Sequence, residues 1–107
     1  MDTDSVSIHE RIQQQMLVHP ILLYMKGTPE QPRCGFSARV VQILDLCGVK
    51  FAHVDVLENP DIRRALPGYS NWPTFPQLFH QGELLGGCDI VEELYRAGVL
   101  LSKLSKT

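Results

Sequence analysis

The sequence predicts an α/β fold in which a four-stranded mixed sheet is flanked by helices. Helical and strand-like segments alternate along the chain, and the last two strand-like segments are separated only by a tight turn. Strands joined through a helix pair in parallel with a right-handed crossover, whereas strands joined by a tight turn are antiparallel. A mixed sheet with helices on both faces satisfies both conditions. The 107 residues have the length of one domain, which we expect to span residues 1–107.

The first segments predict a helix, a central strand and a loop. Ser7 and Glu10 have the spacing of a capping box, and apolar residues then recur every four positions, so we expect a helix that ends near His19. The uninterrupted apolar run 21–25 is typical of a strand that is covered on both faces. Residues 26–33 contain one glycine and two prolines and are expected to form a loop.

A second helix, a second strand and a brief third helix are predicted next. The second helix should begin near Gly35 and end at Gly48. Its inner face is expected to carry Val40, Ile43, Leu44 and Cys47. Residues 51–56 alternate in part between apolar and polar, which indicates a strand. The sequence Asn59-Pro60-Asp61 favours a helix start with a capping asparagine side chain, and we expect this helix to end at Pro67-Gly68.

The C-terminal part predicts a hairpin followed by helices. Residues 76–80 and 83–85 are expected to form antiparallel strands around a turn at 81–82. Gly86-Gly87 then interrupts the chain before a further helix, and residues 99–104 should add a last turn or two.

Composition and charge exclude several classes of protein. Ten basic and twelve acidic side chains give a net charge of −2, which argues against a nucleic-acid partner held mainly by phosphate contacts. The longest apolar runs are about five residues, far short of the roughly 20 needed to span a membrane. Residues 1–15 are polar and include acids, unlike a secretory signal or an Arg-rich transit peptide, so we expect the protein in the cytoplasm.

The cysteines and histidines do not form a conventional ligand set. Cys34, Cys47 and Cys88 are too few and too unevenly spaced for a disulfide framework or for paired zinc ligands. Cys47 falls on the apolar side of its predicted helix and is interpreted as a core residue. No role is assigned to the four histidines, which lack ligand-like spacing: His9, His19, His53 and His80.

Cys34 is the candidate for chemistry because it stands where a loop ends and a helix begins. Unpaired amides and the helix macrodipole favour an anion there, so the thiol ionises more readily, and Lys26 and Arg33 could add positive charge. A dithiol enzyme resolves its mixed disulfide with a second thiol three residues on, but that position is Ser37. Cys34 must therefore recruit an external thiol, use Cys88, or perform another reaction. The alternative is that Cys34 is an inert cap.

Four sequence blocks, in this order, resemble the single-domain monothiol glutaredoxins with the CGFS signature. They are Lys26-Gly27-Thr28-Pro29, Cys34-Gly35-Phe36-Ser37, Trp72-Pro73-Thr74-Phe75-Pro76-Gln77 and Gly86-Gly87-Cys88-Asp89. The likeness covers nearly the whole chain. It implies a thioredoxin fold, in agreement with the pattern of helices and strands, and a binding site for glutathione.

The resemblance implies a role for each residue of that site. Lys26 and Arg63 would pair with the glycyl carboxylate and place positive charge near the Cys34 thiolate. A cis peptide bond before Pro76 would expose the backbone of Phe75, so that the tripeptide pairs with it as an extra strand. The amides of Cys88 and Asp89 would hold the γ-glutamyl carboxylate at a helix start, and the Asp89 side chain the ammonium group.

Simpler interpretations of the same residues stay open at this point. Lys26 could be a solvated strand end, and Arg63 lies on a charged helix face beside Arg64, so their register could be confused. Asp89 could serve only as a helix cap, which is compatible with ligand binding. Trp72 is interpreted as a packing residue rather than a stacking platform.

The resemblance also implies a [2Fe-2S] cluster. Such a cluster needs four thiolate-type ligands, and a homodimer would supply Cys34 twice together with two glutathione sulfurs. Acceptor proteins that take the cluster, and BolA-like proteins, are the implied partners. The loop Gly27–Arg33 is associated in the family with poor reductase activity, so we rank cluster delivery above catalysis.

Two other functions compete with this one. Cys34 could act in an enzyme that removes glutathione from protein mixed disulfides, and whether the protein is an enzyme stays open. Alternatively, the chain could be an interaction module with an incidental thiol. Because Cys88 belongs to a glutathione-site motif, a Cys34–Cys88 disulfide under oxidation is a further hypothesis.

Overall fold

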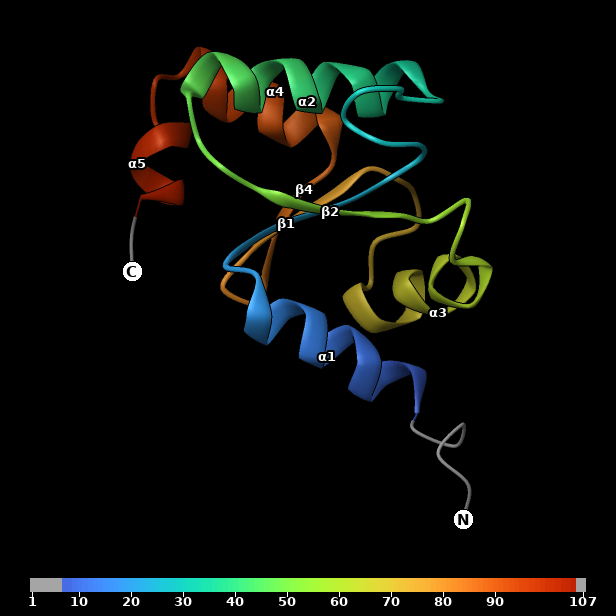
Figure 1. Ribbon diagram of the computed structural model, residues 1–107. Helices are drawn as coiled ribbons and strands as arrows, with labels where there is room; N and C mark the ends of the chain where they lie inside the picture. The colour runs from blue at the N-terminus through green and yellow to red at the C-terminus, as the bar shows by residue number, and fades with distance from the viewer. Residues whose placement is uncertain (1–6, 106–107) are drawn as a thin grey trace.

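The computed structural model describes residues 7–105, so the ends of the predicted domain lie outside the described residues. Figure 1 shows helices on two sides of a central sheet. In chain order the elements are α1 (Ile8–Val18), β1 (Ile21–Met25), α2 (Gly35–Cys47), β2 (Ala52–Asp55), α3 (Pro60–Ser70), β3 (Gln77–His80), β4 (Glu83–Gly86), α4 (Cys88–Arg96) and α5 (Leu100–Leu104). Among the described residues, no helix is long and apolar enough to cross a membrane.

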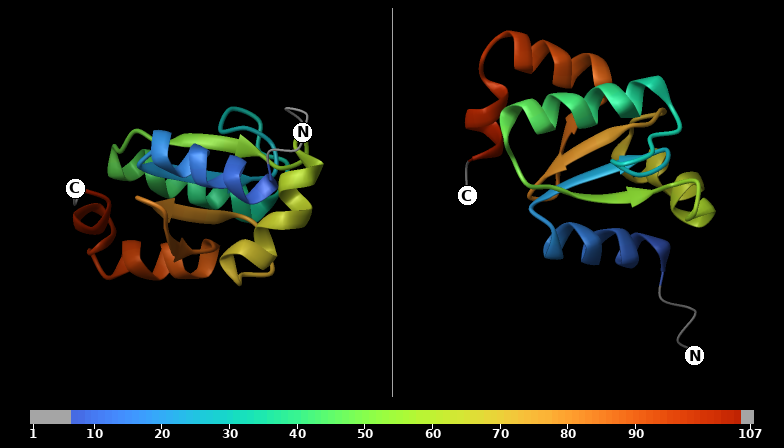
Figure 2. Two further views of the ribbon diagram at one scale, coloured as in Figure 1. Left: turned by 90° about the horizontal axis from the view of Figure 1, so that it is seen from below. Right: turned by 45° about the horizontal axis from the view of Figure 1, so that its top comes forward.

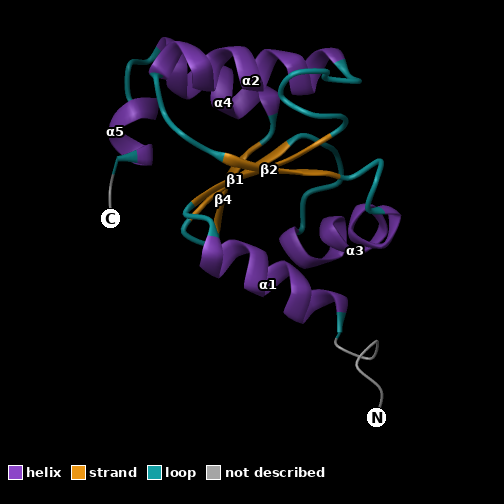
Figure 3. Ribbon diagram, in the orientation of Figure 1, coloured by secondary structure: helices purple, strands orange, loops and turns teal. Residues whose placement is uncertain are grey.

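The four strands form one mixed sheet in the order β2-β1-β3-β4, with the strands gathered between the helices in Figure 3. β1 runs parallel to β2, with Leu23 opposite His53, and antiparallel to β3, with Leu23 opposite Leu78. β3 and β4 form the antiparallel hairpin. This topology confirms the predicted fold class and strand directions. β1 and β2 are parallel because the helix α2 connects them.

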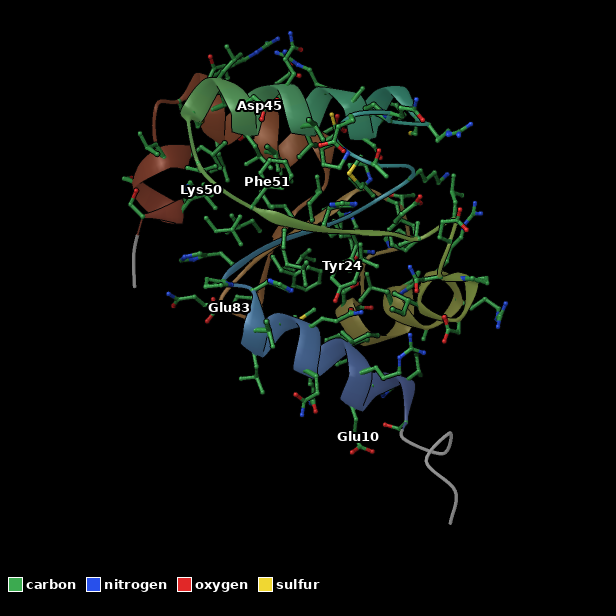
Figure 4. All side chains as sticks on the ribbon, viewed as in Figure 1. Glu10, Tyr24, Asp45, Lys50, Phe51 and Glu83 are labelled. Carbon is green, nitrogen blue, oxygen red and sulfur yellow. The ribbon has the colours of Figure 1, made fainter. Side chains whose placement is uncertain are left out.

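The central strand β1 divides the core into two clusters, one on each face of the sheet. Leu23 and Met25 pack with residues of α2, α4 and α5. Leu22 and Tyr24 pack with residues of α1 and α3. These four side chains are fully buried, as an uninterrupted apolar strand requires when both faces are covered. Figures 1 and 2 show the two helical layers, and Figure 4 places Tyr24 on the α1 side of the sheet.

The predicted caps and inner faces of the first two helices are present. Ser7 and Glu10 form the capping box of α1: the Glu10 amide donates to Ser7 Oγ at 3.1 Å, and the Ser7 amide to Glu10 Oε1 at 3.3 Å. The left-handed Gly48 ends α2. Cys47 is half-buried and packs against the cluster that contains Leu23.

Two predictions about α3 are wrong. The helix continues through Pro67 to Ser70 and ends at the left-handed Asn71, and Tyr69 in this last turn packs against the α1 side of the core. That packing holds the turn after the proline, although a proline inside a helix removes a backbone donor. The Asn59 side chain does not cap the helix, since its amide donates to the Asp55 carbonyl at 2.9 Å.

The loop between β1 and α2 folds back on itself and delivers Cys34 to the end of the sheet. Gly27 and Pro32 form an isolated antiparallel bridge, and the Arg33 amide donates to the Lys26 carbonyl at 2.9 Å. The Gly27 amide donates to Asp55 Oδ1 at 2.9 Å, which ties the loop to β2. Gly27 has φ of 89°, and a Cβ atom there would lie 2.5 Å from the Gln31 carbonyl oxygen. Only glycine fits this crossing of the two arms of the loop.

Substitution at Gly27 should therefore destabilise the protein more than substitution at a glycine with the same backbone requirement and open space. Gly48 provides that control, since it has φ of 71° and, its chain neighbours aside, no atom within 4 Å of the place where a Cβ would stand. Gly48→Ala should lower the free energy of unfolding by ~1–2 kcal/mol, the cost of a left-handed backbone. Gly27→Ala should lower the free energy of unfolding by about 1–3 kcal/mol more than that, because the added Cβ overlaps with neighbouring atoms. Urea unfolding measures both, and equal losses would contradict the crowding at Gly27.

Candidate functional site

One cleft of about 600 Å³ lies where the first turns of α2 and α4, the helix α3 and the segment 72–76 meet. This volume is in the range of small-molecule binding sites. The sequence-predicted site residues all line it: Lys26, Cys34, Arg63, Phe75, Cys88 and Asp89. They come from five places in the chain, so the fold brings together side chains that are up to 63 positions apart (89 − 26).

Cys34 is the N-cap residue of α2, with extended backbone angles, and its side chain is half-buried. Burial by itself raises the pKa of this thiol. The backbone amides of Ser37 and Phe36, the Lys26 ammonium group and the Ser37 hydroxyl act in the opposite direction, and together they hold the pKa of Cys34 below the usual thiol value. The sulfur is therefore both reachable from the cleft and readily ionised.

Ser37 occupies the position at which a dithiol enzyme carries its second thiol. Its side chain is fully buried, and its Oγ accepts a hydrogen bond from the Lys26 amide at 3.1 Å. With that lone pair engaged, the hydroxyl hydrogen is available to favour the Cys34 thiolate. Ser37 thus links the end of β1 to the start of α2 and favours the Cys34 thiolate without supplying a thiol of its own.

The charged residues of the cleft have opposite signs and come from different elements. Lys26 follows β1 and Arg63 projects from α3, whereas Asp89 lies in the first turn of α4. Arg33 is exposed and outside the cleft lining, and it is Arg63 rather than its neighbour that lines the cleft. A ligand that carries both carboxylate and ammonium groups therefore meets complementary charge at separate points.

The segment 72–76 forms one wall of the cleft and packs against the start of α4. The Phe75–Pro76 peptide bond is cis, as the family resemblance implied. Gly87, the N-cap of α4, approaches this wall so closely that a Cβ atom would lie 3.1 Å from Trp72 Nε1 and 3.2 Å from the Pro76 carbonyl oxygen. A glycine at this position lets the uncapped amides of α4 face the cleft beside the wall.

Several lining residues were not assigned to the site from the sequence. They are Phe36, Pro67, Trp72, Pro73 and Thr74. Trp72 was expected only to pack, but it also lines the cleft. Four of the five lie inside the sequence blocks that pointed to the family, so the blocks themselves carried the signal. Pro67 was interpreted as a helix end, but it lies inside α3 and lines the cleft.

The pKa values of the other two thiols are shifted in the opposite direction from that of Cys34. Burial raises the pKa of both Cys47 and Cys88, and for Cys88 the carboxylates of Glu92 and Asp89 add to that rise. All three cysteines are free thiols. Arg39 of α2 donates to Glu92 of α4 at 2.9 Å, which fixes the helix that carries Cys88 against the helix that Cys34 begins.

Within the described residues, no three His, Cys, Asp or Glu side chains converge on a point where they could hold a metal ion. The cleft itself contains two sulfurs and one carboxylate, from Cys34, Cys88 and Asp89.

Comparison with known proteins identifies the family. Residues 21–85 match the family model for glutaredoxin. The chain is 60% identical over 98 residues to Glutaredoxin 4 of Escherichia coli strain K12, which covers 92% of this chain and 85% of that protein. It is 56% identical over 101 residues to Glutaredoxin 4 of Buchnera aphidicola from Acyrthosiphon pisum, covering 94% of each. The chain belongs to the glutaredoxin family. Together with Ser37 in place of a second thiol, these relatives make it a glutaredoxin of the monothiol type.

Solved glutaredoxin structures share the fold. Reduced poplar apo GrxS14 superimposes with a TM-score of 0.81 at 43% identity, covering 94% of this chain and 92% of that one. A buckwheat glutaredoxin solved as a complex with glutathione gives a TM-score of 0.79 at 27% identity, with 90% and 86% covered. The thioredoxin fold expected from the resemblance is therefore confirmed for this glutaredoxin.

The three thiols should differ in reactivity in the order that their pKa values imply. At neutral pH, iodoacetamide should modify Cys34 first, because the lowered pKa leaves more of it as thiolate. Ser37→Ala should move the pH of half-maximal Cys34 alkylation upward, since one thiolate-stabilising group is lost. Ser102→Ala, on the exposed side of α5, is the control. Peptide mass spectrometry follows each site, and faster modification of Cys47 would contradict the assignment.

Oxidation with glutathione disulfide tests the hypothesis of a Cys34–Cys88 bond. The Cys34 thiolate would displace one glutathione from the disulfide, and the Cys88 thiolate would then attack the Cys34 sulfur and release the second. Since both thiols line one cleft, we expect a cross-linked peptide pair in the wild type and in Cys47→Ser but not in Cys88→Ser. Mass spectrometry that finds both thiols free, or Cys34 only glutathionylated, would remove the hypothesis.

Proposed function

We propose that this monothiol glutaredoxin binds glutathione in the cleft and carries a [2Fe-2S] cluster between two copies of the chain for delivery to acceptor proteins. The observation that carries the proposal is a single readily ionised thiol, Cys34, on the wall of a cleft that holds separated positive and negative side chains. The site combines one strong sulfur donor with the recognition groups for a small charged peptide.

Glutathione suits the cleft because it has two carboxylates, one ammonium group and a thiol. Lys26 and Arg63 are the cations available to its glycyl carboxylate. The amides at the start of α4 suit its γ-glutamyl carboxylate, and the Asp89 side chain suits the adjacent ammonium group. The backbone of Phe75 is the edge along which its peptide groups would pair. A related glutaredoxin, from buckwheat, has been solved with glutathione.

The number of sulfur ligands supports a cluster shared between two chains. A [2Fe-2S] cluster is held by four thiolate-type ligands, and each copy offers one low-pKa cysteine. Two Cys34 thiolates and the thiolates of two bound glutathiones complete the set. Phe36, beside Cys34, is 62% exposed and lines the cleft, so it offers apolar surface for a second copy to cover.

The same ligand set supports a role in delivery. Half of the ligands would be exchangeable small molecules, so an acceptor protein could replace them without unfolding the carrier. We propose iron–sulfur acceptor proteins and BolA-like proteins as partners, and a single domain over residues 1–107 as the working unit. A reducing compartment, as the cytoplasm is, would keep the Cys34 thiol free for this role.

The lowered pKa of Cys34 also favours a second candidate function, the removal of glutathione from proteins. The Cys34 thiolate would attack the glutathione sulfur of a protein mixed disulfide and release the protein thiolate. A free glutathione thiolate would then attack the Cys34–glutathione disulfide, forming glutathione disulfide and regenerating Cys34. This cycle needs no second protein thiol, consistent with the serine at position 37.

Anaerobic reconstitution with iron, sulfide and glutathione tests the primary proposal. The wild type should become a coloured dimer, measured by visible absorption and by size-exclusion chromatography. Cys34→Ser should lose essentially all of this absorption while it keeps the far-UV spectrum of the fold, because Cys34 precedes a helix at the surface of the cleft. Cys47→Ser, on the same helix but outside the cleft, should retain the cluster.

The outcomes separate the candidates. A Cys34→Ser variant that retains the visible spectrum would overturn the assignment of Cys34 as a ligand. A colourless wild type that turns over a glutathione mixed disulfide would favour the enzyme. A wild type with neither activity would leave an interaction module.

A further inference from the structure

Gln77 is a buried polar side chain to which neither the family resemblance nor the proposed function gives a role. It is the first residue of β3 and is fully buried. Its side-chain amide donates two hydrogen bonds, from Nε2 to the Trp72 carbonyl at 2.9 Å and to the Thr74 carbonyl at 3.1 Å. Both acceptors belong to the segment 72–76, the wall of the cleft.

This segment has few backbone donors with which to hold itself in place. Two of its five residues, Pro73 and Pro76, have no amide hydrogen. The Trp72 amide is engaged with the Pro67 carbonyl at 3.2 Å, the same carbonyl that accepts from the C-cap residue Asn71. The Gln77 side chain, fixed in the sheet by the pairing of β3 with β1, supplies from outside the donors for two of the segment's carbonyls.

The hydrogen bonds of the Gln77 side chain go to the segment 72–76 and not to the core residues around it. Its Oε1 atom is buried and has no hydrogen-bond partner among the described residues. A buried oxygen without a partner lowers stability, so the contribution of this side chain lies in its two donor bonds. If those donors were removed, the carbonyls of Trp72 and Thr74 would find partners by turning toward water, and the wall of the cleft would move with them.

We propose that Gln77 is a positioning residue: by holding the carbonyls of Trp72 and Thr74, it fixes the wall of the cleft against which glutathione pairs with Phe75. The ligand in this inference rests on the proposed function. Gln77 does not line the cleft and would not contact the ligand. It acts on the ligand indirectly, through the segment 72–76 that it holds in place. Its effect is therefore on glutathione affinity and on the mobility of the wall.

Gln77→Met tests this inference, because methionine has a similar length and volume and no donor. Trp72 is the single tryptophan of the chain and stands in the segment, so its fluorescence reports on the wall directly. We expect acrylamide to quench Trp72 more strongly in the variant than in the wild type. Isothermal titration should show glutathione binding about tenfold weaker, which corresponds to 1.4 kcal/mol.

Leu104→Ala is the control for a general loss of stability. Leu104 packs in the core on the α2 side of the sheet, in α5, and lines no part of the cleft. This variant should unfold at lower urea concentration yet keep the wild-type quenching and affinity. Should Gln77→Met not fold, Gln77→Asn, whose amide is one methylene too short to reach both carbonyls, goes through the same measurements with the same expectation.

Each result then decides one part of the inference. Wild-type quenching of Trp72 and wild-type glutathione affinity in the Gln77 variant would overturn the positioning role. So would changes of equal size in Leu104→Ala. A wild type that binds no glutathione would overturn the proposed function and with it the ligand named here. In that case the quenching comparison alone decides whether Gln77 holds the wall.

Discussion

The double-sided burial of β1 is the constraint on which the rest of this structure depends. Leu23 and Met25 need a layer of helices on one face, and Leu22 and Tyr24 need one on the other. Their burial removes most of the apolar surface of the strand from water, at about 25 cal/mol per Å². Helices held on opposite faces of the sheet can meet only beyond the ends of its strands. The cleft forms there, past the end of β1, from α2, α3 and α4.

Local groups, and not burial, set the pKa of Cys34 apart from those of the other two thiols. Burial raises the pKa of every cysteine in the chain, and for Cys47 nothing opposes it. At Cys34 the amides of the first turn, a nearby lysine and a buried hydroxyl outweigh the same effect. Cys88 also begins a helix, but the carboxylates of Glu92 and Asp89 beside it favour the protonated thiol. A helix start is therefore not sufficient to activate a cysteine, and the neighbouring charges decide.

The arrangement also explains how a serine serves where a dithiol relative has cysteine. Ser37 is buried and bonded to the Lys26 amide, so it joins the strand end to the helix that Cys34 begins. Gln77 stands in a comparable relation to the opposite wall of the cleft, where it holds two carbonyls of a proline-rich segment. In both cases a buried polar side chain fixes a stretch of backbone that has no regular secondary structure of its own, and the ligand-facing groups follow from it.

The sequence by itself determined the element order, the strand directions and the position of Cys34 at a helix start, where its pKa is lowered. These follow from local patterns: a capping box at Ser7, a continuous apolar run in β1 and a tight turn between β3 and β4. Apart from Cys34, the site residues could be named only through the resemblance to a family, since side chains from distant segments leave no periodic signal.

The tertiary structure decided the points at which packing competes with local preference. α3 continues past Pro67 to Ser70, and Tyr69 in the added turn packs against the core on the α1 side of the sheet. Asn59 turns its amide to the Asp55 carbonyl instead of capping its helix. The role of Gln77 depends on which carbonyls lie within 3.1 Å of its amide. Such contacts exist only after the chain has folded, so no pattern along the sequence could have specified them.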